Sequence, residues 1–471
     1  MNKILKQFFQ FSYGNFISLA LSVFTVPVVT RLISPEQFGI ASLALVFVNF
    51  ATLLVLFGGD QTLARYYYDL FGAQKRNLLW KLGKVSIFVY SVLSIISLIY
   101  YKQISLYFFG IDTDIMPLVA ILGISGLNVL QTYFRMVIRM EKRGNAFSFQ
   151  IILTKLVKFL CTVVLLKWFA NSYSSLLIAE FLAIMLGVVY FMYSTRPFWI
   201  GRKLPKLPMS FKDLFSFGWP IALSTFLFVI LQSIDQLVLK YFYNAHEVGM
   251  YAGGYRLVTM LQIFVSAFVT YWVPLSYEKY KEGENNRFFE QAFGVVYVIA
   301  MLVVLTFIAS NRVIVLLLGN EFREASAVIP LLIFIPAMQL LTSITNVGIN
   351  FRKRTDFHII VTSLVLFISI VLNVILTPIL GIRGASIAAS FTYVVYFISY
   401  TVVGSRFFSI KVGYTHEMIV LIISYCLAIS VSFEMFDIAI LRFIAIVLAA
   451  LVIYGKLGML LRLANFKQYL K

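Results

Sequence analysis

The chain has 471 residues, of which 61% are hydrophobic and only 13% are charged. Its mean hydropathy of +0.90 excludes a soluble multidomain protein. A formal net charge of +19 must be kept mostly outside the hydrocarbon, so any basic group left at membrane depth is a functional candidate by default.

The hydropathy pattern predicts an all-α, polytopic membrane protein. About 20 apolar residues cross a bilayer core, and fourteen stretches meet that length. The predicted spans are 11–33, 38–58, 82–101, 115–137, 147–168, 174–195, 214–239, 249–277, 290–309, 325–349, 357–377, 384–404, 416–434 and 438–461. The longest polar connectors, 59–81 and 196–213, leave no room for a globular domain.

The cysteine, histidine and N-terminal patterns exclude several other classes. The first span lacks a small-residue cleavage site, so we expect a retained anchor rather than a signal peptide. Cys161 and Cys426 both fall within apolar spans and are expected to be apolar fillers. With three histidines and no cluster of ligand-type residues, neither a metal site nor a cofactor is predicted.

The loops carry a strong charge bias that predicts orientation. With the N-terminus inside, cytoplasmic segments hold 26 basic residues and the opposite loops hold 8. The positive-inside rule therefore favours an even number of spans in a bacterial plasma membrane, with both termini cytoplasmic. Since topology accounts for most of the net charge, binding to nucleic acid is a poor explanation of it.

The chain partly repeats itself at a spacing of 204 to 211 residues. Phe11-Ser12-Tyr13-Gly14-Asn15 is echoed by Phe215-Ser216-Phe217-Gly218-Trp219, and the turn before Gly39 is echoed by the turn before Gly249. Lys142-Arg143 is echoed by Lys353-Arg354. Six spans separate each pair, which predicts a parallel six-plus-six repeat with a substrate site between two lobes; chance likeness among apolar helices is the alternative.

Two turns carry a resemblance to a known family. The segments Arg31-Leu32-Ile33-Ser34-Pro35-Glu36-Gln37-Phe38-Gly39 and Ser233-Ile234-Asp235-Gln236-Leu237, the latter followed by Glu247-Val248-Gly249-Met250-Tyr251, resemble polysaccharide transporters. These belong to the multidrug/oligosaccharidyl-lipid/polysaccharide flippase superfamily, whose best-known polysaccharide members are the O-antigen (Wzx-type) flippases. The resemblance covers the whole chain in length and spacing, but the motifs separate substrate classes poorly.

The resemblance implies an architecture and a cargo. Two six-helix lobes, 1–200 and 201–410, would form a V-shaped cavity, and 411–471 would add two helices. The cargo would be an undecaprenyl-diphosphate-linked oligosaccharide moved from the cytoplasmic to the outer leaflet. Its partners would be the lipid bilayer, the lipid-linked glycan and, downstream, a polysaccharide polymerase and chain-length proteins.

Lys155 and Lys158 lie near the midpoint of the fifth span, three residues apart and hence on one helix face. At this depth their stems would have to reach roughly 15 Å to the interface, further than snorkelling usually carries a lysine. They are expected either to form a cationic wall for a pyrophosphate or acidic sugar, or to pair with Glu180 in a neutralised strut. Two lysines against one carboxylate leave a surplus positive charge.

Other charged residues near span ends have two readings each. Arg31 and Arg65 are expected to be interface anchors or substrate ligands, and Tyr66-Tyr67-Tyr68 beside Arg65 would suit sugar stacking and phosphate binding. Asp235 and Arg256 are expected to form an interhelical pair, placed where the lobes close and so able to act as part of a gate. Asp235 and Glu180 are also candidates for binding a coupling cation, with proton and sodium left open.

Three rival functions remain beside the oligosaccharide flippase. A drug antiporter of the same superfamily would favour an acidic, aromatic cavity, and a lipid II flippase is not separated by these residues. A membrane polymerase or glycosyltransferase would need catalytic groups at an aqueous face. The outer loops are short and without a paired acidic motif, and no phosphate-binding loop for ATP is present, so no enzyme is predicted.

Overall fold

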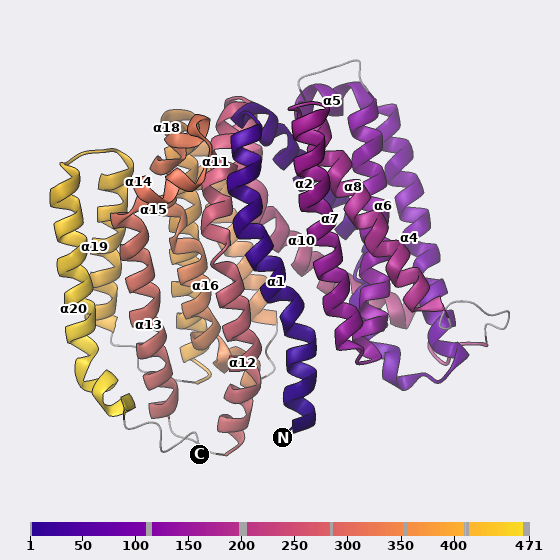
Figure 1. The fold of residues 1–471 in the computed structure, drawn as a ribbon. Coiled ribbons are helices and arrows are strands. Elements are labelled where there is room, and N and C mark those ends of the chain that lie inside the picture. The colour runs from indigo at the N-terminus through magenta and orange to yellow at the C-terminus, as the bar shows by residue number, and fades with distance from the viewer. Residues whose placement is uncertain are drawn as a thin grey trace. The chain divides into compact units, whose positions relative to one another are not determined.

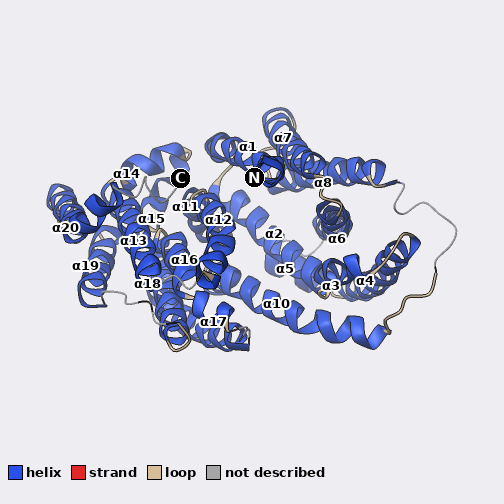
Figure 2. Ribbon diagram, turned by 90° about the horizontal axis from the view of Figure 1, so that it is seen from below, coloured by secondary structure: helices blue, strands red, loops and turns tan. Residues whose placement is uncertain are grey.

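A computed structural model describes residues 2–109, 115–196, 205–282, 286–352, 354, 356–408, 410 and 414–464. All regular structure in these residues is helical (Figures 1 and 2). The first ten helices are α1 (Asn2–Leu32), α2 (Pro35–Leu56), α3 (Gly59–Tyr66), η1 (Tyr67–Asp69), α4 (Ala73–Ile99), α5 (Tyr101–Phe109), α6 (Met116–Met140), α7 (Gly144–Trp168), α8 (Tyr173–Ser194) and α10 (Phe211–Phe242).

The second half continues in the same way. Its helices are α11 (Ala245–Thr259), α12 (Gln262–Lys281), α13 (Asn286–Ala309), α14 (Asn311–Ile314), η2 (Val315–Leu317), η3 (Asn320–Ala327), α15 (Ile329–Leu332), α16 (Phe334–Thr345), α17 (Val347–Phe351), α18 (Asp356–Ser405), α19 (Tyr414–Ser432) and α20 (Ile438–Ala464).

The prediction of an all-α, multi-pass membrane protein is confirmed. Among the described residues, ten helices are long and apolar enough to cross a membrane, and α19 and α20 contain shorter apolar segments. Every predicted span overlaps a helix. One boundary was wrong: the connector 59–81 already holds α3, η1 and the start of α4. The predicted span 249–277 lies within one apolar stretch, Ala245–Lys281, which contains the two helices α11 and α12. The predicted span 325–349 is broken by a bend of 54° between η3 and the α15–α16 segment.

The chain forms two compact units that divide within α10, between Ser233 and Ile234. The domain boundaries predicted at 200/201 and 410/411 adjoin stretches outside the described residues, so the lobe limits stay predictions. Arg202, Lys203 and Lys353, which enter the charge count, also lie outside the described residues.

The two echoed turns have the same local geometry. Ser34 caps α2, with its hydroxyl accepting a hydrogen bond from the backbone N–H of Gln37, and Asn244 caps α11 by accepting from the N–H of Glu247. Both caps have extended backbone and satisfy an otherwise unpaired donor of the first turn. The sequence echo therefore corresponds to a repeated structural device. Gln37 adds a bond of its own, because its Oε1 accepts from the backbone N–H of Tyr173 at 2.9 Å.

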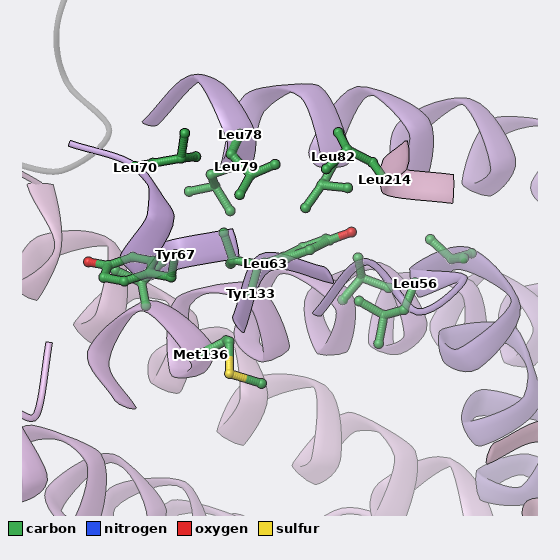
Figure 3. Packing of buried hydrophobic residues seen from close by; sticks show 13 residues of the cluster. Leu56, Leu63, Tyr67, Leu70, Leu78, Leu79, Leu82, Tyr133, Met136 and Leu214 are labelled. Atoms are coloured by element: carbon green, nitrogen blue, oxygen red, sulfur yellow. The ribbon is translucent and has the colours of Figure 1, made fainter. Parts of the chain in front are cut away.

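In the first unit, α7 packs against both α1 and α8 (Figure 2). Gly14 permits the α1 contact: a Cβ there would lie 2.6 Å from the Ser148 backbone, and the Ser148 hydroxyl donates to the Gln10 carbonyl at 2.7 Å. A second contact region is a buried apolar cluster that joins the end of α2 to α3, α4 and α6, with Leu63 and Tyr133 within it (Figure 3). Small residues at close helix contacts are typical of membrane bundles, where packing replaces the hydrophobic effect.

In the second unit, α18 is two antiparallel helices that meet at Gly381. This residue has φ 58° and ψ −135°, a conformation that only glycine adopts readily. The halves are close enough for the Tyr400 hydroxyl to lie 3.2 Å from Nδ1 of His358. The helices α19 and α20 pack on α13 and α15 (Figure 1), and Tyr425 of α19 donates to the Ile387 carbonyl at 3.1 Å.

Candidate substrate and coupling sites

The α7–α8 pair holds the first candidate site. Lys158 of α7 forms an ion pair with Glu180 of α8, and their side chains are 24% and 18% exposed. The strut predicted between these spans is therefore present for Lys158. Two partly buried charges that face each other in apolar surroundings satisfy one another, which is the usual condition for charge at membrane depth.

Lys155 has different surroundings from Lys158, although both lie near the middle of α7. Its side chain is exposed, one turn before Lys158. The charged residues of α7 and α8 are three lysines, Lys167 being in the last turn of α7, and one carboxylate, Glu180. Near the middle of the two helices, the sequence therefore places two lysines and one carboxylate. Whichever lysine pairs with Glu180, one positive charge is left over on these two helices, as expected from the sequence.

Buried polar side chains, which were not predicted, continue this site along the same helices. Gln150 and Thr154 precede Lys158 at spacings of eight and four residues, and Gln150 donates to the Thr154 hydroxyl at 2.9 Å. A Cβ at Gly187 of α8 would lie within 2.6 to 2.8 Å of Thr154, Gln131 and Gln150. These groups converge on a glycine, and the four-residue spacing on α7 was the signal that could have revealed them.

Arg135 of α6 belongs to the same polar region. Its guanidinium donates to Oε1 of Gln131 at 2.9 Å, one turn earlier on the helix. The region thus places amides, a hydroxyl and a guanidinium among three packed helices. Polar groups at this depth are costly unless they bond to one another or serve a ligand.

Arg65 and Arg31 occupy exposed positions. Arg65 lies in the last turn of α3, pairs with Asp69 at 3.0 Å and lies 5.4 Å from the centre of the Tyr66 ring. Arg31 is in the last turn of α1. The tyrosines beside Arg65 differ in exposure: Tyr68 is exposed, whereas Tyr67 is buried. This burial raises the pKa of Tyr67. Arg65 and Tyr68 therefore keep surfaces that a sugar phosphate can reach.

The second unit holds a buried carboxylate at Asp235. Its side chain is 5% exposed and accepts hydrogen bonds from the Tyr251 hydroxyl at 2.8 Å and from the Asn373 amide at 2.9 Å. Neither donor is Arg256, the partner expected from the sequence; Arg256 is half-buried in the last turn of α11. Asn373 comes from α18, 138 residues away in the chain, and no spacing in the sequence indicated this contact.

The Asp235 site continues into a set of buried polar and aromatic groups. Tyr251 stacks on Tyr255 at 6.2 Å, and Thr377 donates to Oδ1 of Asn373 at 3.4 Å. Gln236, the next residue in the chain, is also buried. A carboxylate with neutral oxygen-bearing neighbours, rather than a cationic partner, is a chemically suitable place to hold a proton or a small cation.

Metal chemistry has no dedicated cluster in the described part of the chain. No group of three or more His, Cys, Asp or Glu side chains there is arranged to hold a metal ion. The side chains at the two sites supply electrostatic and hydrogen-bonding interactions: a basic region on α7 and a buried acid in the second unit.

With these sites in place, comparison with known proteins identifies the class. The model of a family described as polysaccharide biosynthesis protein matches residues 4–279, more than half of the chain. The chain belongs to this family. A Haemophilus influenzae protein of the Lsg locus is 21% identical over 329 residues, which cover 68% of this chain and 78% of that protein.

Two solved structures share the fold. The inward closed conformation of the lipid II flippase MurJ has a TM-score of 0.69 at 14% identity, covering 96% of this chain and 99% of that one. An inward-facing multidrug resistance transporter of the MATE family has a TM-score of 0.59 at 14% identity, covering 83% and 95%. The chain thus shares its fold with a lipid II flippase and with a multidrug resistance transporter.

Proposed function

We propose that this protein flips an undecaprenyl-diphosphate-linked oligosaccharide, an O-antigen, capsule or exopolysaccharide repeat unit, from the cytoplasmic to the outer leaflet by alternating access. The proposal is supported most by the family match taken together with the surplus basic charge at the middle of α7. A diphosphate-linked glycan is an anionic cargo, and a cationic surface within a membrane protein attracts it.

The site residues have distinct proposed roles. Lys155 contacts the anionic part of the cargo, while Lys158 and Glu180 form the strut that holds α7 against α8. Arg65, Arg31 and Arg256 are proposed as further contacts for phosphate or sugar. Asp235 binds the coupling ion and acts at the gate, because this buried acid accepts from two neutral donors, Tyr251 and Asn373, and its interactions change when an ion binds.

The cell-level test is deletion of the gene in the source bacterium, followed by measurement of surface glycan and of lipid-linked oligosaccharide in each leaflet. Loss of surface glycan with accumulation of unchanged lipid-linked repeat units on the inner leaflet is expected. Re-expression should restore delivery. Normal surface glycan in the deletion strain would contradict the proposal.

A purified system separates the rival functions. The protein is reconstituted in vesicles with a fluorescent lipid-linked oligosaccharide in one leaflet, and its appearance in the other leaflet is followed. Lengthening of the glycan would indicate a polymerase instead. Because the structural likeness to the lipid II flippase covers 96% of this chain, lipid II is the second substrate to test, and preferential movement of lipid II would replace the proposed cargo.

A further inference from the structure

A groove in the first unit, outside the sites described above, lies between α4 on one side and α6 and α8 on the other. Its volume is about 660 Å³, and its lining includes Leu79, Trp80, Gly83, Ile87, Leu130 and Phe181. Leu79 and Tyr133, seen in Figure 3, form part of its inner wall. The size lies within the range of roughly 300 to 1,000 Å³ that is usual for ligand pockets.

The groove offers a ligand hydrocarbon contacts rather than hydrogen bonds. Its two tyrosines use their hydroxyls within the protein: Tyr133 bonds to the Ser86 hydroxyl at 2.8 Å, and Tyr90 donates to the Leu122 carbonyl at 3.0 Å. Since these polar atoms already have partners, an apolar chain can occupy the space without leaving a polar group unsatisfied.

Gly83 differs from the other glycines of the groove, because it is not needed for close packing between helices. A Cβ at Gly123 would approach Phe181 at 3.0 Å and one at Gly126 would approach Tyr90 at 3.1 Å, so these glycines serve helix packing. A Cβ at Gly83 would meet nothing within 4 Å. Glycine inside a helix costs about 0.5–1 kcal/mol relative to alanine, so its use here, with ordinary helical geometry and no close neighbour, keeps the groove open.

A cation lies on the same face of α4. Trp80, Lys84 and Ile87 follow each other at spacings of four and three residues and so share one face, on which Trp80 and Ile87 border the groove. The Lys84 side chain is exposed although it lies about three turns into an apolar span. A lysine there extends toward the Ala73 end of α4, the cytoplasmic end in the predicted topology.

We propose that this groove binds the isoprenoid chain of the lipid carrier, with Lys84 contacting its phosphate. The inference rests on the proposed function and adds the place where the cargo's lipid part is held. From Leu79 to Tyr90 the lining spans roughly 16 Å along α4, by the helical rise. A single groove with one cation suits a lipid with one chain and an anionic head, whereas a bilayer phospholipid has two chains to place.

The binding test uses the full chain, purified in detergent, with undecaprenyl phosphate as the probe and native mass spectrometry as the readout. Gly83→Leu places a side chain in the groove and should weaken binding at least about tenfold, since displaced hydrocarbon contacts each contribute to affinity. Val92→Trp, a larger side chain at an exposed position on the opposite face of the same helix, should bind like wild type. Ile87→Trp narrows the groove from its edge and replaces Gly83→Leu if that variant misfolds.

The head group is tested separately. Lys84→Gln should weaken binding of undecaprenyl phosphate about tenfold or less while leaving binding of undecaprenol unchanged, because undecaprenol lacks the phosphate. Equal binding of undecaprenyl phosphate by wild type, Gly83→Leu and Ile87→Trp would overturn the proposal. Displacement of the probe by an equal concentration of phosphatidylglycerol would also overturn it, by showing a site for ordinary bilayer lipid.

Transport measurements on the same variants separate the two proposals. If wild type binds the probe in a Gly83-dependent way but delivers no glycan, the flippase function is wrong and the groove stands. If wild type and Gly83→Leu deliver glycan equally and bind the probe equally, the groove is wrong and the flippase function stands.

Discussion

Lys158 of α7 and Glu180 of α8 form an ion pair between two packed membrane-spanning helices. Lys158→Gln removes one charge and leaves the carboxylate partly buried, which should destabilise the protein by up to about 3 kcal/mol. A lower melting temperature in detergent and less protein in membranes are expected. Adding Glu180→Gln should restore both. A double variant as unstable as Lys158→Gln alone would contradict the strut.

Lys155 should act on transport rather than on folding. Lys155→Gln is expected to leave membrane abundance unchanged and to reduce glycan delivery at least about tenfold, because one charge-assisted contact to phosphate contributes about 1.5–3 kcal/mol. Lys155→Arg should retain part of the activity, since phosphate accepts either cation. Lys167→Gln, at an exposed position in the last turn of the same helix, is the matched control. Normal delivery by Lys155→Gln would exclude a role for this charge.

Asp235 offers a test of coupling. Asp235→Asn keeps size and an acceptor oxygen for Tyr251 or Asn373, so we expect a folded protein that transports poorly and no longer responds to an imposed ion gradient. Asp235→Ala leaves both buried donors without their acceptor, at about 1–3 kcal/mol for each group. Its melting temperature should fall well below that of Asp235→Asn. Gradient-dependent transport by Asp235→Asn would remove Asp235 from coupling.

Two glycine-to-alanine changes should have opposite consequences. Gly187→Ala places a methyl group within 2.8 Å of three polar side chains and is expected to cost about 1–3 kcal/mol. Gly83→Ala meets no atom within 4 Å and should leave the melting temperature unchanged or slightly higher. Thermal unfolding of both purified proteins measures the difference. Equal melting temperatures would show that the convergence on Gly187 carries no packing constraint.

Topology follows from the charge bias and can be checked by cysteine labelling. After replacement of Cys161 and Cys426, cysteines at Asn171 and Asn244, both exposed, should react with an impermeant reagent in intact cells. A cysteine at Lys206 should react only after the membrane is permeabilised. Labelling of Lys206 from outside would reverse the orientation.

Much of the fold could be predicted from local pattern. Each of the fourteen predicted apolar stretches overlaps a helix in the described residues, because apolar length decides which segments can cross a membrane. The turns before Gly39 and Gly249 were recognised as an echo, but their capping by Ser34 and Asn244 was not predicted. The breaks near Thr259 and Val328 were missed, since continuous hydropathy does not register a bend.

Interactions within the sites were predicted correctly only where the two residues lie on consecutive spans. Glu180 was expected beside Lys158 because α7 and α8 are consecutive, and the pair is present. The partners of Asp235 could not be predicted, because Asn373 reaches it through a fold contact with no sequence periodicity. Arg256, near in the chain, was therefore the wrong choice of hydrogen-bond partner for this carboxylate.

The turn at Gly381 has a consequence for how the protein is made. A single residue reverses the chain between two apolar helices, and the Tyr243 hydroxyl donates to the Pro378 carbonyl at 3.0 Å just before it. With no loop between them, neither half can be placed in the bilayer while the other waits in the translocation channel. The two helices are expected to enter the membrane together as one hairpin, and lengthening this turn should trap a half-inserted chain.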